Sequence, residues 1–182
     1  MPLTIIERRI MKSLAKHGTK TFPTLESVQA KGRWLTERQV IAAKAANPAI
    51  ARAWRDKIIE VAKSRTLSEL CDTRVIPQFS GVPEILAHRR KLMLARIATF
   101  QGRPSFAGLA EHITGDSNKI SAVSKDPIVR TAAEARLIAL LKKMTIVEII
   151  DQRLDRKASK EVQKYVDERK KREGVEKKRQ TW

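Results

Sequence analysis

Cysteine and histidine are both scarce in this sequence. The single cysteine, Cys71, excludes an intramolecular disulfide and any zinc site built from several thiolates. The three histidines, His17, His88 and His112, lie far apart, and none has a second histidine or a cysteine at the spacing of metal ligands. We interpret each histidine as a surface or interface side chain, and we predict neither a metal ion nor a cofactor.

The sequence also lacks the motifs of the common enzyme classes. Its seven glycines are scattered, so no glycine-rich loop can cradle a phosphate, and no serine-nucleophile or kinase signature is present. Glu148, Asp151 and Asp155 fall on one helical face, where carboxylates can hold a divalent cation. Because no second acidic cluster accompanies them, we interpret them as a solvated acidic stripe and predict that the protein is not an enzyme.

Long apolar runs are absent as well. No stretch approaches the roughly 18 apolar residues that span a bilayer, and no apolar run is followed by the small-residue cleavage site of a secretory signal. Aromatic residues make up only 4% of the chain and hydrophobic residues 42%. At 182 residues, the chain can therefore form one domain of ordinary size with a modest core.

What the sequence has in excess is positive charge. It contains 38 lysines and arginines against 20 aspartates and glutamates, which gives a net charge of +18. A compact chain with this charge repels itself, and binding to a polyanion relieves the repulsion. Nucleic acid is the usual polyanion, so the composition favours a protein that binds nucleic acid.

A helix-start motif recurs along the chain. A threonine is followed three residues later by glutamate or glutamine, which is the capping box that satisfies free amides at a helix N-terminus. The four copies are Thr4–Glu7, Thr36–Gln39, Thr66–Glu69 and Thr145–Glu148. Two further starts place a capping side chain before proline, at Asn47-Pro48 and Asp126-Pro127. These signals predict an all-α protein.

Apolar periodicity between these starts sets the expected helices. They cover residues 5–17, 37–46, 48–64, 67–72, 84–101, 105–114, 127–144 and 146–173, with a short turn at 24–30. We expect an irregular multi-helix body over residues 1–144, with a connector near 74–83 between two helical halves. Residues 145–182 are expected to form a C-terminal helix and basic tail, a long basic helical extension, because the apolar stripe fades after Tyr165.

The N-terminal segment has a character of its own. It has no acidic residue from Arg8 to Leu25, and its isoleucines and Leu14 can line one helical face. A basic, acid-poor amphipathic helix is typical of mitochondrial targeting segments, and it also fits a basic first helix of the fold. We predict a mitochondrial location, with the cytoplasm as the alternative.

Four basic stretches are the candidate nucleic-acid contacts. The first is the N-terminal segment, and the second is a turn in which Trp34 could stack on an unpaired base or anchor the turn to the core. The third has no acidic residue from Ile85 to Ala110 and contains three arginines that recur every seven residues, and the fourth is the tail. The residues concerned are Arg8, Arg9, Lys12, Lys16, Lys20, Arg33, Trp34, Arg89, Arg90, Lys91, Arg96, Arg103, Lys170, Lys171, Arg172, Lys177, Lys178 and Arg179.

Residues 105–125 carry a rival pattern. An apolar segment, a turn glycine at Gly115 and a second apolar segment resemble a helix-turn-helix DNA reader. The second helix of such a reader would offer Asn118, Lys119, Ser121 and Ser124 to the major groove. The glycine falls one place later than the pattern wants, and the second helix carries little positive charge.

We therefore predict a structural RNA-binding component of a large ribonucleoprotein, such as a mitochondrial ribosomal protein, that neutralises rRNA phosphates and bridges neighbouring proteins. Two alternatives remain open. One is a helix-turn-helix DNA-binding protein of a phage, plasmid or regulator that uses residues 105–125, and the other is an assembly subunit that binds no nucleic acid.

Overall fold

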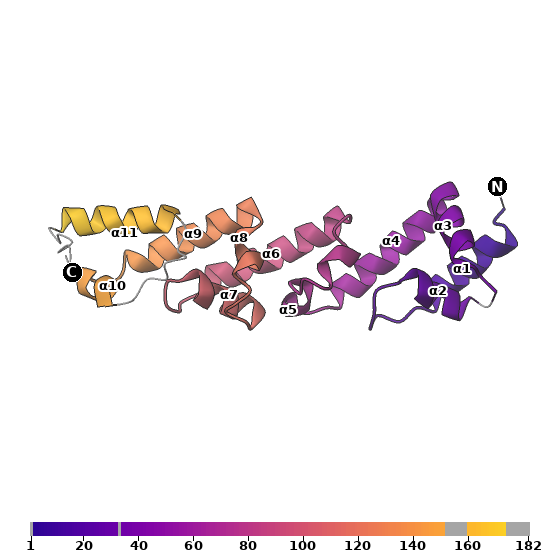
Figure 1. Cartoon of the computed structure of the whole chain (residues 1–182), viewed down its shortest axis with the longest axis horizontal. Helices are drawn as coiled ribbons and strands as arrows, with labels where there is room; N and C mark the ends of the chain where they lie inside the picture. Colours follow the sequence, from indigo (N-terminus) through magenta and orange to yellow (C-terminus); the bar gives the residue numbers. More distant parts are fainter. Residues whose placement is uncertain (1, 33, 152–159, 174–182) are drawn as a thin grey trace, which may run out of the picture. The chain divides into compact units, whose positions relative to one another are not determined.

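The computed structural model describes residues 2–32, 34–151 and 160–173, and it is all-α (Figure 1). Eleven α-helices and one 3₁₀ turn make up the regular structure of these residues, and none of them forms a strand. The chain divides into two compact units, Met1–Arg89 and Arg90–Trp182, so the boundary falls within helix α6.

The predicted helix starts are confirmed by their hydrogen bonds. In each of the four threonine motifs, the hydroxyl accepts the amide of the third residue, and that residue's side chain accepts the threonine amide. Asn47 and Asp126 accept the amides that open α4 and α9. A further box, Thr24 with Ser27, starts α2, and the pattern missed it because glutamate or glutamine is the usual partner.

The first unit is built from helices that pack on one another. Among them α1, α2, α3 and α4 share extensive contacts. Its elements are α1 (Ile5–Ala15), α2 (Leu25–Lys31), α3 (Glu37–Ala46), α4 (Pro48–Lys63), α5 (Leu67–Leu70), η1 (Ile76–Gln78) and the first part of α6 (Pro83–Thr99).

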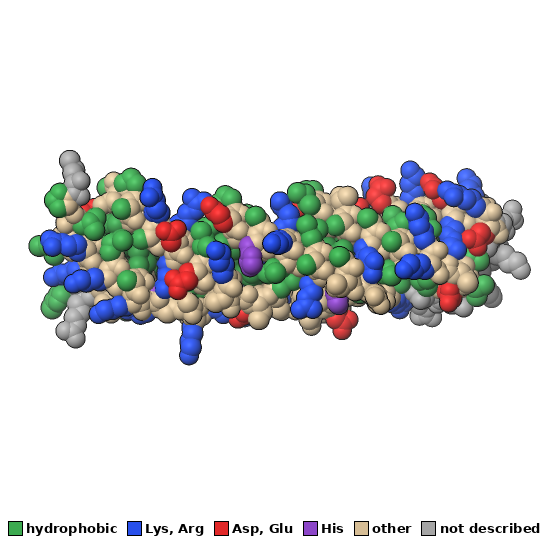
Figure 2. Space-filling model, turned by 180° about the vertical axis from the view of Figure 1, so that it is seen from behind, with side chains coloured by type: hydrophobic (Ala, Val, Ile, Leu, Met, Phe, Trp, Pro, Cys, Tyr) green, Lys and Arg blue, Asp and Glu red, His purple; other side chains and the backbone are tan. Residues whose placement is uncertain are grey.

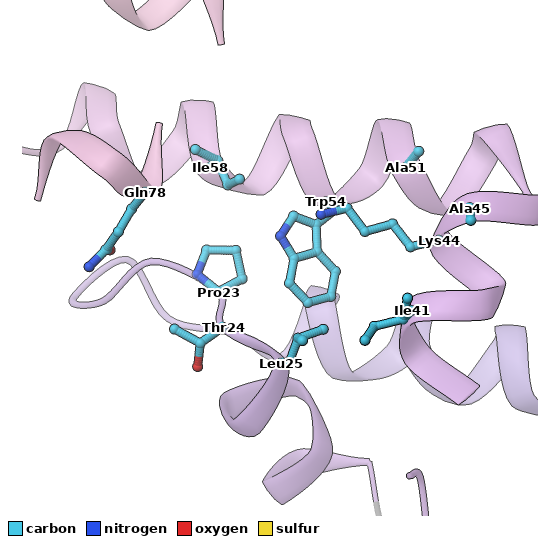
Figure 3. Close-up of a pocket in the computed structure, with 10 residues that line it drawn as sticks. All are labelled: Pro23, Thr24, Leu25, Ile41, Lys44, Ala45, Ala51, Trp54, Ile58 and Gln78. Carbon is cyan, nitrogen blue, oxygen red and sulfur yellow. The ribbon is translucent and has the colours of Figure 1, made fainter. Parts of the chain in front are cut away.

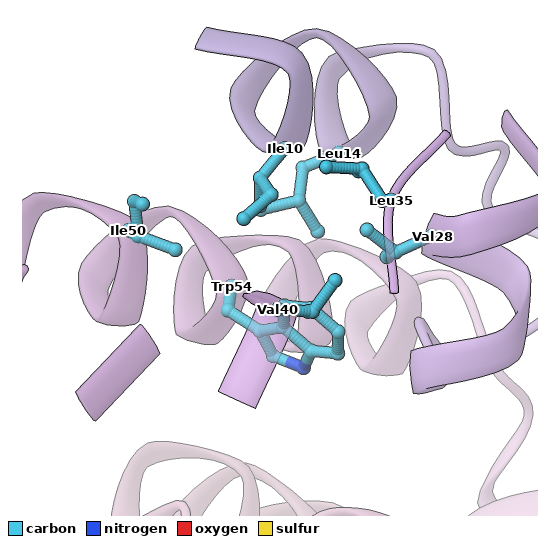
Figure 4. Close-up of a cluster of buried hydrophobic side chains, with 7 residues drawn as sticks. All are labelled: Ile10, Leu14, Val28, Leu35, Val40, Ile50 and Trp54. Atoms are coloured by element: carbon cyan, nitrogen blue, oxygen red, sulfur yellow. The ribbon is translucent and has the colours of Figure 1, made fainter. Parts of the chain in front are cut away.

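Seven buried side chains form the core of this unit (Figure 4). They are Ile10, Leu14, Val28, Leu35, Val40, Ile50 and Trp54. Burial of one such aliphatic or aromatic side chain stabilises a fold by about 1.5–3 kcal/mol. The cluster is therefore a main source of stability for the first unit.

Helix α1 belongs to this core. Ile10 is fully buried, and the buried Ser13 hydroxyl donates to the carbonyl of Val28 over 2.7 Å. The Glu7 carboxylate accepts a hydrogen bond from the side-chain amide of Asn47, which together with the capping bonds lowers the pKa of Glu7. The basic N-terminal segment is thus the first helix of the fold, and its removal would open the core.

The segment predicted as a connector lies in the first unit. Phe79 is buried, and the centre of its ring lies 5.9 Å from that of Phe22. Val82 is buried as well. Residues 74–83 therefore contribute side chains to the packing of this unit.

The second unit contains the rest of α6 and five further helices. They are α7 (Phe106–Thr114), α8 (Ile120–Ser124), α9 (Pro127–Leu141), α10 (Ile146–Asp151) and α11 (Lys160–Arg172). Helix α7 packs on α8, α8 on α9, and α11 on both α9 and α10. The fully buried Leu109, Val123, Leu137 and Leu141 supply its core.

The long basic extension predicted for the C-terminus is not confirmed. Val162 and Val166 of α11 are buried, and the Arg169 guanidinium donates to the carbonyl of Leu141 over 2.6 Å. The prediction of a single helix over residues 146–173 was wrong, because α11 packs beside α10 and does not continue it in a straight line. The two valines form a short apolar stripe in a very polar segment, so the periodicity there is weak.

Candidate nucleic-acid interface

The outer face of α1 carries only positive charge. Arg8, Arg9, Lys12 and the C-cap residue Lys16 are all exposed, and Lys12 lies three or four residues from each of the others, so the four share one side of the helix. We call these four residues the α1 basic face. Lys20 follows in the exposed segment beyond the helix.

These cations have no carboxylate partner among the described residues. None of the four forms an ion pair with another residue in the described part of the chain, whereas Arg55 and Arg130 pair with glutamates. Like charges four residues apart destabilise a helix, so an anion bound to this face would stabilise it. Figure 2 shows lysine and arginine side chains over the visible face, with acidic ones less frequent.

The turn after α2 adjoins the α1 basic face. The ammonium group of Lys31 donates to the backbone carbonyl of Lys16 over 3.3 Å, so the C-terminal ends of α1 and α2 lie together. Lys31 is exposed and adds its charge to that end of the face. The ammonium also interacts favourably with the negative end of the α1 dipole.

Trp34 projects from the same turn. Its side chain is 87% exposed and its backbone φ is 70°, a conformation that is strained for a bulky residue. The buried Leu35 anchors the turn, and its amide donates to the carbonyl of Gly32. Trp34 is therefore held out in solvent, three residues after Lys31, where an unpaired base could stack on it.

The third basic stretch is only partly available. Its exposed residues are Lys91, Arg96 and Arg103, and its half-buried ones are Arg89 and Arg90. Arg90 pairs with Asp126 over 2.8 Å, so the fold supplies an acid that the local sequence lacks. Burial raises the pKa of Asp126, but the hydrogen bonds from Arg90 and from two backbone amides outweigh it and lower that pKa. The seven-residue repeat also breaks, because α6 ends at Thr99.

The predicted tail contacts are divided between α11 and residues beyond it. Lys171 and Arg172 are exposed and Lys170 is half-buried, while Arg172 lies 3.7 Å from the Glu168 carboxylate. Arg33, Lys177, Lys178 and Arg179 lie outside the described residues.

The rival pattern at residues 105–125 does form two helices joined by a turn. Gly115 ends α7 with a φ of 76°, and Leu109 and Val123 are buried, as such a pair of helices requires. Helix α8 has only five residues, and Asn118 precedes it. Little more than one helical turn is therefore available to enter a DNA groove.

Some of the arginines stabilise the fold by donating hydrogen bonds to backbone carbonyls, a role that the sequence analysis did not predict. Carbonyl groups near helix ends lack a donor within the helix, and a guanidinium group can supply one. Two arginines donate in this way at helix ends, Arg136 to Phe100 and Arg169 to Leu141, and Arg65 donates to the carbonyl of Lys20 in the loop between α1 and α2.

Where the structure describes them, the histidines and carboxylates do not gather into a metal site. Contrary to prediction, His17 is buried, with its ring nitrogens 2.9 Å from the Gly18 carbonyl and 3.1 Å from the Ser27 hydroxyl. No group of three or more histidine, cysteine or acidic residues in the described ranges could hold a metal ion. Glu148 caps α10, and the Asp151 side chain and Asp155 lie outside the described part.

Comparisons with known proteins identify no relative. No protein-family model and no curated protein matches the chain, and no solved structure does. Among the described helices, none combines the length and the apolar character needed to cross a membrane.

Proposed function

We propose that this protein is a non-enzymatic RNA-binding component of a large ribonucleoprotein, and that a ribosomal particle, the mitochondrial one first, is the assembly to examine. The observation that carries the proposal is the α1 basic face. It presents four exposed cations, none paired with a carboxylate within residues 2–32, 34–151 and 160–173, on a helix whose other side is fixed in the core.

Phosphate binding would relieve the repulsion along α1. From Arg8 to Lys16 the face extends for about 12 Å, at about 1.5 Å per residue. Each phosphate contact releases condensed counterions, so the binding should weaken steeply as salt is added. Because Ile10 and Ser13 fix the helix in the core, little conformational freedom is lost on binding.

Trp34 favours single-stranded RNA as the target. Bases in a duplex already stack on one another, whereas unpaired bases offer a free ring face. Stacking on an aromatic side chain contributes about 1–3 kcal/mol per base. We expect Trp34→Ala to weaken single-strand binding by about tenfold, and Trp34→Phe to keep most of the affinity because it retains a ring.

The test is association of the full-length protein with ribosomal subunits in a sucrose gradient at moderate salt. The wild-type protein should co-sediment and should be released by ribonuclease. Replacing all four residues of the α1 basic face with glutamine should leave the protein at the top of the gradient, with its circular dichroism unchanged.

A matched control variant removes the same amount of charge elsewhere. It replaces four cations that are already ion-paired and that are not candidate RNA contacts: Arg55, Lys57, Arg74 and Arg130. This variant should still co-sediment. Equal loss in both variants, or association that survives ribonuclease, would argue against specific use of the α1 basic face.

The DNA-reader alternative has its own outcome. It would replace the RNA proposal if the protein selected one DNA duplex sequence and if Asn118→Ala, Lys119→Ala and Ser121→Ala abolished that selection. The short α8 and its low charge weigh against this outcome.

A further inference from the structure

A pocket of about 610 Å³ opens beside Trp54 in the first unit (Figure 3). Its walls come from the segment before α2, from α3 and α4, and from η1. The apolar part of the wall includes Pro23, Leu25, Ile41 and Ile58. This volume lies within the usual range for ligand pockets, about 300–1,000 Å³.

The indole N–H of Trp54 has no hydrogen-bond acceptor within the described part of the chain. Trp54 is only 4% exposed. Its indole nitrogen is not among the fully buried polar atoms without a hydrogen-bond partner, so this unpaired nitrogen keeps some exposure to solvent. In Figure 3 the nitrogen lies on the ring edge that faces Pro23, and in Figure 4 it lies away from Ile10 and Leu14. Buried tryptophans usually satisfy this donor, so the group is available to a ligand that accepts a hydrogen bond.

Lys44 adds a positive charge to the same pocket. Its ammonium group lies 4.7 Å from the centre of the Trp54 ring, and it forms no ion pair with another described residue. None of the described residues that line the pocket carries a carboxylate. At the rim, Ile41 is 49% exposed, which is unusual for a large aliphatic side chain. The pocket thus combines apolar walls, the Trp54 N–H, the Lys44 ammonium group and the polar side chains of Thr24 and Gln78, and its described lining carries no negative charge.

We infer that this Trp54 pocket docks an acidic amphipathic peptide segment of a partner protein. A large apolar side chain of that segment packs against Trp54 and Ile41. A neighbouring carboxylate accepts the Trp54 N–H and pairs with the Lys44 ammonium group. A charge-assisted bond of this kind fixes orientation, while the apolar contact supplies most of the affinity. No residue of the pocket belongs to the α1 basic face, so the inference does not depend on RNA binding.

The test follows the Trp54 indole signal by NMR in the ¹⁵N-labelled full-length protein. The chain has three tryptophans, and Trp34→Phe and Trp54→Phe assign their signals. The probes are two capped hexapeptides with the same leucine–phenylalanine pair, flanked by glutamates in one and by lysines in the other. The glutamate peptide should shift the Trp54 signal saturably and bind about tenfold more tightly than the lysine peptide.

Three variants locate the interaction. Lys44→Gln should remove most of the preference for the glutamate peptide. Ile41→Ser should weaken binding of both peptides, and Ala42→Ser, a matched change at an exposed position of the same helix, should leave it unchanged.

Four results would overturn the inference. They are no saturable shift at Trp54, equal binding of the two peptides, a preference that survives Lys44→Gln, and a Trp54 shift caused by a single-stranded oligonucleotide or by protein concentration alone. The last would assign the pocket to a nucleobase or to a second copy of the chain.

Discussion

Replacing Ile10 with alanine should destabilise the first unit by about 3 kcal/mol. The side chain is fully buried in the core that α1 shares with α2, α3 and α4. The substitution removes three carbons, worth about 0.8 kcal/mol each on transfer from water. The cavity left behind adds a further amount, within the range of about 2–5 kcal/mol for buried isoleucine. Ile5→Ala provides the matched control on the same helix, because Ile5 is 64% exposed and its replacement should change stability by less than about 0.5 kcal/mol.

Urea unfolding measures both changes, with circular dichroism for the helices and fluorescence for Trp54 in the same core. The m-value should stay constant, so that the shift in midpoint reports stability. If Ile10→Ala proved as mild as Ile5→Ala, α1 would not be packed as described. The cations of the α1 basic face would then lack a fixed surface, and the segment would be free to act as a detachable targeting helix.

Three further outcomes follow from local contacts. In thermal unfolding, Arg169→Gln should lower the midpoint of the second unit by a few degrees, because it removes a hydrogen-bond donor to the end of α9. The control Lys171→Gln, on the exposed side of α11, should leave the midpoint unchanged. Gly115→Ala should cost about 1 kcal/mol, because its φ of 76° disfavours a side chain, while Gly18→Ala meets no neighbouring atom and should be nearly neutral in urea unfolding. The lowered pKa of Glu7 means that its charge stabilises the fold above the ordinary value of 4.5 and that this contribution is lost as the pH falls through the lower folded-state value. The stability advantage of the wild type over Glu7→Gln should therefore be present at neutral pH and disappear in acid.

The helices were predictable because their start signals are local. The bond between Thr36 and Gln39 depends only on residues within one turn, and α3 has the predicted bounds, Glu37–Ala46. The path after α9 was not predictable in the same way. It depends on Val162 and Val166 meeting α9, and on Arg169 reaching a carbonyl 28 positions earlier in the chain.

The same difference between local and distant contacts decides which features of the candidate site could be predicted. The charge on α1 could be read from the sequence, because an amphipathic helix must turn its cations outward when its isoleucines face the core. Whether Trp34 or Leu35 anchored their turn could not be read, since both are large and apolar. The ion pair of Arg90 could not be predicted either, because Asp126 is distant in sequence. The pocket beside Trp54 depends on how α3 and α4 pack, which the sequence does not show.

The most direct test of the central claim is the salt dependence of binding to single-stranded RNA. If about six phosphates are neutralised, a plot of log affinity against log salt concentration for the wild type should have a slope of about −4. Replacing the α1 basic face with glutamines should make the slope shallower by about 3, at about 0.7 per phosphate contact. The control that replaces the four ion-paired cations Arg55, Lys57, Arg74 and Arg130 with glutamine should change it much less. A flat dependence for the wild type, or equal changes in the two variants, would contradict the claim that α1 binds the phosphates.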